Sequence, residues 1–435
     1  MAERIEWYRE FIDTEYKPKA SDMKVLFYYE PAPGVSREDA IARVASESSA
    51  GTWTTLAVLP LLLPKVKGYA YSYSKNFVKI AYPRIIFEDA SVPGMMSGFG
   101  GNVFGMKAVK NLRLLDAELP LDYIRTFRGP RYGRDVFKRI FKRAHGPITA
   151  VVPKPKLGYT SREHAEVVGY QIWRGGIDCL KDDENLTNQR FNRFEDRVKW
   201  VAKVRNRVEK ETGDVKEAFI NCTAPTLKEL ERRVRLVHEH GFRYFMLDLV
   251  VSGFTAMGTA AELAHDYDMA IHGHRAMHAM FTRNPKHGMS MLYFAKLARL
   301  IGIDQVHTGT VIGKLEGPKK EIMAMNDLLT KQAVGEIANL RMPQRWGKIK
   351  SVVPVSSGGL HPGILPKVFD IYGTTDIVVQ VGGGTQGHPD GIEAGARAVV
   401  QAIEAYKAGI ELEDYAKTHK ELRRALEKWG RLTPI

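Results

Sequence analysis

From residue 148 onward the sequence repeats one pattern: a short apolar stretch, a polar or glycine-rich turn, and an amphipathic segment of helical period. The pattern occurs eight times. We expect strands at 148–152, 179–180, 217–221, 244–250, 269–272, 305–307, 352–355 and 377–380. We expect helices at 162–173, 194–212, 227–240, 256–267, 289–301, 319–331, 362–372 and 391–407. Eight strand–helix units require a parallel sheet buried on both faces, which predicts a closed α/β barrel of the TIM (β/α)8 type.

The chain of 435 residues is longer than one ordinary core, so we expect two domains. The barrel domain takes residues 131–435, and a helix at 413–429 forms a tail outside the eight units. Residues 1–130 mix short strands with helices, which predicts a smaller α+β domain of the ferredoxin-like kind. Its expected strands are 23–29, 70–74, 77–82 and 85–87, and its expected helices are 35–49 and, more weakly, 103–112.

Composition narrows the class of partner. Lysine and arginine number 64 against 50 acidic residues, a net charge of +14. The basic residues are dispersed, which favours an anionic substrate or a basic surface over nucleic-acid binding. Cys179 and Cys222 have no metal-ligand spacing, so we expect neither disulfides nor structural zinc, as in a reducing cytoplasm. The longest apolar run, 56–63, contains Pro60 and is far shorter than the roughly 20 residues of a membrane helix. We therefore expect a soluble, cytoplasmic protein.

Every expected barrel strand ends in residues that can carry chemistry. In this fold the active site lies at the C-terminal ends of the strands. In chain order these ends hold Lys154 and Lys156; Lys181, Asp183 and Glu184; Asn221; Asp248; His272, His274 and Arg275; His307; Ser357, Gly358 and Gly359; and Gly382, Gly383 and Gly384. Charged residues and histidines are too sparse in the chain for this distribution to arise by chance. The sequence therefore predicts an active site at this rim.

The second strand end suggests a metal site. Strand alternation sends Lys181 and Asp183 to the same face, and the following turn can bring Glu184 beside them. Two carboxylates and a further oxygen ligand suit Mg²⁺. Lysine can supply that ligand only as an uncharged amine or as a carbamate formed with CO₂. The alternative is a solvated surface run of charges that contributes little.

Two phosphate sites are expected on either side of the metal. The glycine-rich turns after the seventh and eighth strands let backbone N–H groups approach an oxyanion. Arg275 and His307 offer a second cationic patch across the mouth, so a substrate with a phosphate at each end would bridge the two. The triplet Gly382, Gly384 and Gly387 matches a dinucleotide fingerprint, but it lies in the eighth unit and not in the first turn of an open sheet, so NAD binding is not expected.

The segment 308–317 after the sixth strand is rich in glycine. It is either an ordinary connection or a lid that excludes water from the barrel mouth. As a lid it would bring Lys314 onto a developing negative charge.

Taken together, these motifs resemble the large subunit of ribulose-1,5-bisphosphate carboxylase/oxygenase (RuBisCO) over nearly the whole chain. The segments that carry the resemblance are Gly51-Thr-Trp-Thr-Thr55, Gly101-Asn-Val-Phe-Gly105, Lys154-Pro-Lys156, Gly176 to Asn185, His272-Gly-His-Arg-Ala-Met-His278, His307 to Gly317, Ser357-Gly-Gly359 and Gly382-Gly-Gly-Thr385. Two further segments, 281–285 and 415–422, are most similar to the archaeal form III branch.

The resemblance implies carboxylation of ribulose 1,5-bisphosphate by CO₂, with oxygenation by O₂ as a side reaction. Two molecules of 3-phosphoglycerate would form through a Mg-bound enediolate. Lys181, carbamylated by an activator CO₂, would bind Mg²⁺ with Asp183 and Glu184 and would take the C3 proton. In an archaeal form III setting the resemblance implies nucleotide salvage and not photosynthesis.

The resemblance also assigns the other side chains. Lys154 would protonate the carbanion of the cleaved product, and Lys156 would support its charge state. His274 would assist proton transfer at C3, and Lys314 would stabilise the new carboxylate. Phosphates and hydroxyls would be held by Arg275, His307, Ser357, Gly358, Gly359, Gly382, Gly383 and Thr52. Crowding by Lys154 and Lys156 is expected to disfavour the ammonium form of Lys181 and so free its amine for CO₂.

Four residues of the first domain, Glu47, Thr52, Trp53 and Asn102, pass as ordinary structural residues on their own. The resemblance implies that a partner subunit donates them to the substrate site. This predicts an obligate homodimer, with a larger ring of dimers as a further option and no small subunit implied.

Two departures from the family pattern stand out. Val152 occupies a position where many relatives carry threonine, so a polar contact near the bound sugar is in doubt. The segment 56–67 is richer in leucine and proline than in most relatives, which puts the fine geometry of the partner-donated loop in doubt.

Two other functions remain as alternatives. One is a RuBisCO-like enolase or isomerase that enolises a related sugar phosphate without carboxylating it. Such relatives typically lack several of the residues above, whereas this chain keeps Lys154, His274 and Lys314. The other is a nucleic-acid-binding protein that uses the net positive charge, which would require a steeply salt-dependent affinity.

Overall fold

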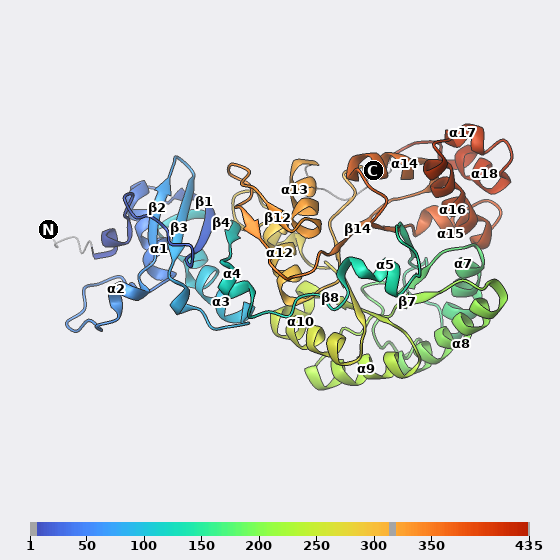
Figure 1. Ribbon diagram of the computed structural model, residues 1–435, viewed down its shortest axis with the longest axis horizontal. Coiled ribbons are helices and arrows are strands. Elements are labelled where there is room, and N and C mark those ends of the chain that lie inside the picture. The colour runs from blue at the N-terminus through green and yellow to red at the C-terminus, as the bar shows by residue number, and fades with distance from the viewer. Residues whose placement is uncertain (1–6, 313–318, 434–435) are drawn as a thin grey trace. The chain divides into compact units, whose positions relative to one another are not determined.

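The protein consists of two compact units in the computed structural model, which describes residues 7–312 and 319–433 (Figure 1). The first unit takes Met1–Arg128, Met277–Ile301 and Lys331–Ile349. The second takes Gly129–Ala276, Gly302–Thr330 and Lys350–Ile435. The division into domains at residue 130 stays a prediction, because compactness groups segments by contact and not by their ability to fold alone.

The first unit is built on a five-stranded sheet with the strand order β10-β4-β1-β3-β2. Its strands are β1 (Met23–Pro31), β2 (Tyr69–Tyr73), β3 (Phe77–Tyr82), β4 (Val109–Glu118) and β10 (Gly288–Met289). β10 runs parallel to β4, and the other pairs are antiparallel. A separate ribbon pairs β12 (Ala333–Val334) with β13 (Gln344–Arg345). A mixed sheet with helices confirms the predicted α+β class for this part of the chain.

The helices of the first unit are short. They are η1 (Trp7–Phe11), α1 (Arg37–Glu47), α2 (Leu63–Val66), η2 (Arg84–Ile86), α3 (Val92–Phe99), η3 (Asn102–Gly105), α4 (Leu121–Ile124), α11 (Ala279–Thr282) and α12 (Met291–Ile301). α1 begins at Arg37, where the Ser36 side chain caps it by accepting a hydrogen bond from the Asp39 N–H. α12 is tied to β4 by a fully buried ion pair, in which Lys296 Nζ lies 2.6 Å from Asp116 Oδ1.

Two expectations for the first unit are wrong. The strand expected at 85–87 is the single-turn helix η2, which follows Pro83. The helix expected at 103–112 is instead the short η3 followed by β4. β4 pairs with β1 in antiparallel register, Tyr29 opposite Leu112 and Tyr28 opposite Arg113. This pairing with a distant strand outweighs the weak helical pattern of the local sequence.

The second unit is a barrel of eight parallel strands in the order β7-β6-β5-β15-β14-β11-β9-β8. They are β5 (Ile148–Val151), β6 (Cys179–Lys181), β7 (Glu217–Phe219), β8 (Tyr244–Asp248), β9 (Ala270–His274), β11 (Gln305–His307), β14 (Val353–Ser357) and β15 (Val378–Gln380). Met246 closes the ring between β8 and the end of β7, because its N–H donates to Ile220 O and its carbonyl accepts from Cys222 N–H. The barrel confirms the predicted fold, and all eight strands lie where the sequence pattern places them.

Helices follow the strands on the outside of the barrel (Figure 1). The main ones are α8 (Phe194–Thr212), α9 (Leu227–Glu239), α10 (Leu249–Asp266), α13 (Lys319–Thr330), α14 (Leu365–Tyr372) and α16 (Ile392–Ala408). The shorter ones are η4 (Gly133–Asp135), α5 (Val136–Arg139), α6 (Ser161–Glu163), η5 (His164–Gly169), α7 (Tyr170–Arg174), η6 (Pro362–Ile364) and α15 (Gly383–Gln386).

The tail is two helices and not the single helix expected at 413–429. α17 (Leu412–Tyr415) and α18 (Lys420–Trp429) are separated by a turn. The rings of Tyr415 and His419 stack with their centroids 3.8 Å apart, and His419 Nδ1 lies 2.8 Å from the Tyr415 carbonyl oxygen. His419 has an extended backbone and starts α18, which ends the first helix early.

Across residues 7–312 and 319–433, the helices are all too short or too polar to span a lipid bilayer.

Candidate active site

The end of β6 carries the side chains expected to hold a metal. Lys181 is 1 % exposed, and its Nζ donates to the Asp182 carbonyl oxygen at 2.7 Å. Lys181, Asp183 and Glu184 all line one cavity of about 790 Å³ at the C-terminal end of the barrel. The structure therefore brings the three residues together, as strand alternation and a following turn require.

Asp183 lines the cavity, whereas its neighbour Asp182 does not. Its carboxylate is buried, accepting from Arg197 Nε at 2.9 Å and from the Asn221 N–H at 3.0 Å, and it lies 3.2 Å from His164 Nε2. Burial alone would raise the pKa of Asp182, but the Arg197 guanidinium and the other donors outweigh it and lower the pKa to about 2. Asp182 therefore anchors the turn after β6 to α8, a role that no sequence motif indicated.

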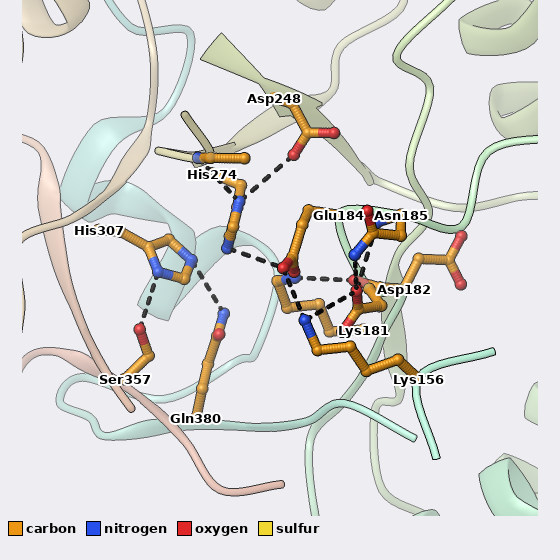
Figure 2. Close-up of polar contacts among 12 residues, drawn as sticks. Lys156, Lys181, Asp182, Glu184, Asn185, Asp248, His274, His307, Ser357 and Gln380 are labelled. Atoms are coloured by element: carbon orange, nitrogen blue, oxygen red, sulfur yellow. Dashed lines mark hydrogen bonds and ion pairs between the residues drawn. The ribbon is translucent and has the colours of Figure 1, made fainter. Parts of the chain in front are cut away.

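The two cavity carboxylates are paired with two lysines. Lys154 Nζ lies 3.2 Å from Asp183 Oδ2, and Lys156 Nζ lies 3.0 Å from Glu184 Oε1 and 3.8 Å from Asp183 Oδ1. Figure 2 shows Lys156 extended toward Glu184. The hydrogen bond to Glu184 raises the pKa of Lys156. This edge of the cavity therefore attracts positive charge.

Lys181 has a pKa below its usual value, and the expected reason for this is wrong. Lys154 and Lys156 are engaged by the carboxylates, and burial is the main cause of the lowered pKa of Lys181. The nearby carboxylates, Glu184 first, oppose the shift without cancelling it. A buried lysine that sheds its proton easily offers the amine that reaction with CO₂ needs.

His274 ends β9 between two acidic groups (Figure 2). Its Nδ1 lies 3.3 Å from Asp248 Oδ1, and its Nε2 lies 3.9 Å from Glu184 Oε2. Asn221 Nδ2 in turn donates to Asp248 Oδ2 at 3.1 Å. Burial lowers the pKa of His274, so the ring is neutral near neutral pH and can accept a proton.

The glycine-rich turns after β14 and β15 line the same cavity. Gly358 and Gly359 have φ values of 110° and 76°, a conformation that favours glycine. A Cβ on Gly384 would lie 2.3 Å from the Leu360 carbonyl oxygen, so the two turns pack backbone to backbone. Ser357, Gly382 and Gly383 also face the cavity. The two glycine-rich turns thus adjoin at the cavity, and their role as a phosphate cradle stays a prediction.

Arg275 and His307 differ in what they can offer an anion. Arg275 is 7 % exposed, and within the described residues its guanidinium makes no hydrogen bond or ion pair. Burial lowers the pKa of Arg275 to about 10, which leaves it charged at neutral pH. Both ring nitrogens of His307 are engaged, Nδ1 with Ser357 Oγ at 2.9 Å and Nε2 with His272 Nε2 at 3.0 Å. A buried guanidinium with no partner in the described part of the chain is better suited to an anion than an imidazole whose two nitrogens are engaged.

The remaining predicted residues lie elsewhere. Glu47, Thr52, Trp53 and Asn102 belong to the first unit. Asn102 Nδ2 donates to Glu47 Oε1 at 3.4 Å, and Trp53 is 74 % exposed. Lys314 lies outside the described residues, so its part in a lid stays a prediction.

Several cavity residues were missed by the sequence reasoning. They are Leu360, His361, Gln380 and Trp429. Gln380 is the last residue of β15, so the rule of polar strand ends could have found it. Trp429 belongs to the helical tail, where no local signal points to the barrel mouth.

Comparison with known proteins gives a consistent result over the full chain. Two family models match: "Ribulose bisphosphate carboxylase large chain, N-terminal domain" over residues 10–123, and "Ribulose bisphosphate carboxylase large chain, catalytic domain" over residues 134–429. The curated ribulose bisphosphate carboxylase of Pyrococcus abyssi is 48% identical over 435 residues, covering 99% of both chains. That of Archaeoglobus fulgidus is 48% identical over 447 residues, covering 100% of both chains.

Solved structures agree. The dimeric archaeal Rubisco of Hyperthermus butylicus matches with a TM-score of 0.93 and 47% identity, covering 98% of this chain and 100% of that chain. The octameric Rubisco of Pyrococcus horikoshii matches with a TM-score of 0.91 and 46% identity, covering 98% and 97%. With both family models and full-length relatives in agreement, the chain belongs to the ribulose bisphosphate carboxylase large-chain family.

Proposed function

We propose that the protein carboxylates ribulose 1,5-bisphosphate with CO₂ to give two molecules of 3-phosphoglycerate, with oxygenation by O₂ as a side reaction. One observation carries the proposal: Lys154, Lys181, Asp183, Glu184 and His274 converge on a single cavity at the C-terminal rim of the barrel. Groups suited to phosphate lie on the β14 and β15 turns and at Arg275. The resemblance of the chain to the archaeal form III branch supports a place in nucleotide salvage.

The residues at the β6 end fit a magnesium site. Asp183 and Glu184 already hold two ammonium groups within 3.2 Å, so this edge of the cavity favours cations. Carbamylation of Lys181 joins its nitrogen to the carbon of CO₂ with loss of a proton, and adds an oxygen ligand of the kind that Mg²⁺ prefers. Lys181 as carbamate, Asp183 and Glu184 would then hold the ion. When bound, Mg²⁺ supplies Lewis-acid stabilisation of negative charge on substrate oxygens.

The chain's own side chains supply the proton transfers. The Lys181 carbamate takes the C3 proton, and neutral His274 beside it accepts or returns a proton at the same end of the cavity. Lys154 protonates the carbanion of the cleaved product. Lys156 stays protonated because its hydrogen bond to Glu184 raises its pKa. Lys181 is buried, which limits access of water to the group that takes the C3 proton.

Phosphates bind at the two sides of the mouth in this proposal. The backbone of Gly359, Gly382 and Gly383 approaches one phosphate closely, because these glycines leave no side chain in the way. Arg275 meets the other phosphate with a charge that the described part of the protein does not neutralise.

The active unit in this proposal is a homodimer. Glu47, Thr52, Trp53 and Asn102 of one subunit complete the substrate site of the other. The high exposure of Trp53 supports this, because an exposed indole is a costly residue unless a partner covers it.

Fixation of labelled CO₂ tests the proposal. Purified protein with Mg²⁺, ribulose 1,5-bisphosphate and labelled CO₂ is expected to place the label in 3-phosphoglycerate. Lys181→Met is expected to abolish it. Lys216→Met is a matched control, because Lys216 is also buried and pairs with Asp214 at 3.2 Å outside the cavity. Label fixed by the Lys181→Met variant would end the proposal. Exchange of the C3 proton with solvent, without fixed label, would instead identify an enolase or isomerase.

A further inference from the structure

Below the cavity, five side chains in the barrel interior form one continuous hydrogen-bond chain. Tyr244, Gln305, His272, His307 and Ser357 make up this chain, which we call the relay. Gln305 Nε2 donates to Tyr244 Oη at 2.8 Å, and Gln305 Oε1 lies 2.9 Å from His272 Nδ1. His272 Nε2 then lies 3.0 Å from His307 Nε2, and His307 Nδ1 lies 2.9 Å from Ser357 Oγ. Figure 2 shows the His307 end of the relay.

The Tyr244 end of the relay is closed to solvent. Tyr244, Gln305 and His272 are fully buried, and His307 is 2 % exposed. The Phe219 ring stacks on His272 with the centroids 4.1 Å apart and the planes 7° from parallel. Because these groups are buried, their hydrogen bonds have to be satisfied by other side chains of the barrel interior.

The two imidazoles are neutral. Burial lowers the pKa of both His272 and His307 well below the usual value. A neutral imidazole has one N–H and one lone pair, so a single hydrogen lies between the two Nε2 atoms. Its position sets the direction of every other hydrogen bond in the relay. Two directions can be written: all donors point toward Tyr244, or, with the Gln305 amide turned over, all point toward Ser357.

Gln305 favours the first direction, because its Nε2 donates to Tyr244 Oη and its Oε1, which can only accept, faces His272 Nδ1. The Gln380 amide nitrogen lies 2.9 Å from His272 Nε2 and 3.3 Å from His307 Nε2. In this direction the one lone pair of His272 Nε2 accepts from His307 Nε2, and the Gln380 N–H can only share it. The hydrogen then resides on His272 Nδ1 and donates to Gln305 Oε1. His307 carries its hydrogen on Nε2, and its Nδ1 accepts from the Ser357 hydroxyl.

We propose that Tyr244 and Gln305 are positioning residues that act through His272 and His307 to fix the hydroxyl of Ser357. In this arrangement the Ser357 hydrogen points at His307, so that Ser357 Oγ presents lone pairs to the cavity. Ser357 then accepts a hydrogen bond from a hydroxyl of the substrate and does not donate one to a phosphate. This deepens the proposed carboxylation of a bisphosphate sugar and rests on it.

A double-mutant cycle tests the coupling. Tyr244→Phe removes one oxygen from the far end of the relay and keeps the ring. It is expected to raise the KM for ribulose 1,5-bisphosphate roughly five-fold, the effect of one lost hydrogen bond, with kcat changed less than about two-fold. Ser357→Ala is expected to raise KM by a similar or larger factor. Adding Tyr244→Phe to Ser357→Ala is expected to change KM no further, because Tyr244 acts only through Ser357.

The control is Tyr293→Phe. Tyr293 is equally buried, and its hydroxyl has no hydrogen-bond partner among the described residues. This variant is expected to leave KM unchanged, which separates the relay from a general effect of altering a buried tyrosine. An unchanged KM in Tyr244→Phe, or the same factor of change in the Ser357→Ala background, would overturn the proposal.

A second measurement judges the relay independently of catalysis. Nitrogen NMR of the histidine-labelled protein is expected to find His272 protonated on Nδ1 and His307 on Nε2, with Gln305→Met abolishing the first assignment. The opposite pair of tautomers, or fast averaging between them, would overturn the direction proposed here. If the wild type fixes no CO₂, the proposed function fails, while these spectra still decide whether the relay exists.

Discussion

Asp182 and Asp183 are neighbours in the sequence, yet one is structural and the other faces the cavity. Asp182 binds the fully buried Arg197, whereas Asp183 lies 3.2 Å from Lys154. The alternation of a strand decides which carboxylate faces the cavity, and this could be predicted. The identity of the cation behind the strand could not, because Arg197 lies a helix away and ordinary helical arginines carry no signal of burial.

Removing Arg197 is expected to cost the protein much of its stability. Arg197→Met leaves the Asp182 carboxylate buried without its main partner, and the loss of one member of a buried ion pair costs about 3 kcal/mol or more. The free energy of unfolding, measured in urea, checks this. The matched control is Arg207→Met, which breaks the exposed pair with Glu166 and is expected to cost less than about 0.5 kcal/mol. Equal losses in the two variants would contradict the structural role of Arg197.

Glu217 makes the free energy of unfolding depend on pH in a predictable way. It is buried at the start of β7, and burial raises its pKa to about 7. The folded state thus binds this proton more tightly than the unfolded state, whose carboxyl has a pKa near 4.5. The stability that this proton brings is fully present below about pH 4.5 and is lost as the pH rises to about 7.

Glu217→Gln is therefore expected to raise the free energy of unfolding above pH 7, by up to about 3 kcal/mol, and to change it little near pH 4.5. Urea denaturation at pH 8 and pH 5 measures the difference. A variant that is less stable than the wild type at pH 8 would show that the ionised form of Glu217 stabilises the folded protein.

Among the helices and strands, those of the barrel could be predicted from the sequence, and those of the rest of the chain less well. Each barrel strand is short and apolar and ends in a polar or glycine-rich turn, so both its position and its functional end can be inferred from the sequence. The errors fall where distant contacts decide, as in β4, whose pairing with β1 overrides a helical pattern. Trp429 illustrates the same limit at the site, since only the packing of α18 brings it to the cavity.

The close packing of the β14 and β15 turns predicts an effect on substrate binding. Gly384→Ala would place a methyl group 2.3 Å from the Leu360 carbonyl oxygen, so the two turns must separate. We expect the KM for ribulose 1,5-bisphosphate to rise at least about ten-fold, because displaced backbone N–H groups bind a phosphate poorly. Gly258→Ala in α10 is the control, since its Cβ meets no atom within 4 Å. An unchanged KM in Gly384→Ala would show that the turns are not the phosphate cradle.

If the active unit is the proposed homodimer, two inactive variants should restore activity when they form mixed dimers. Lys181→Met damages the barrel site, and Glu47→Gln damages the part donated to the partner. When the two are refolded together in equal amounts, half of the dimers are mixed, and each mixed dimer holds one intact site. About a quarter of the wild-type carboxylation is then expected, while each variant alone has almost none. A mixture as inactive as its components would mean that each chain builds its own site.

The segment after α18 lies at the edge of the cavity, with practical consequences for engineering. Trp429 and His361 both line the cavity, and His361 Nε2 donates to the Leu432 carbonyl oxygen at 2.7 Å. A purification tag or reporter domain joined beyond Leu432 would therefore leave the protein beside the opening through which the sugar enters. Such fusions are expected to slow turnover through obstruction alone, so a cleavable tag is the safer choice for kinetic work.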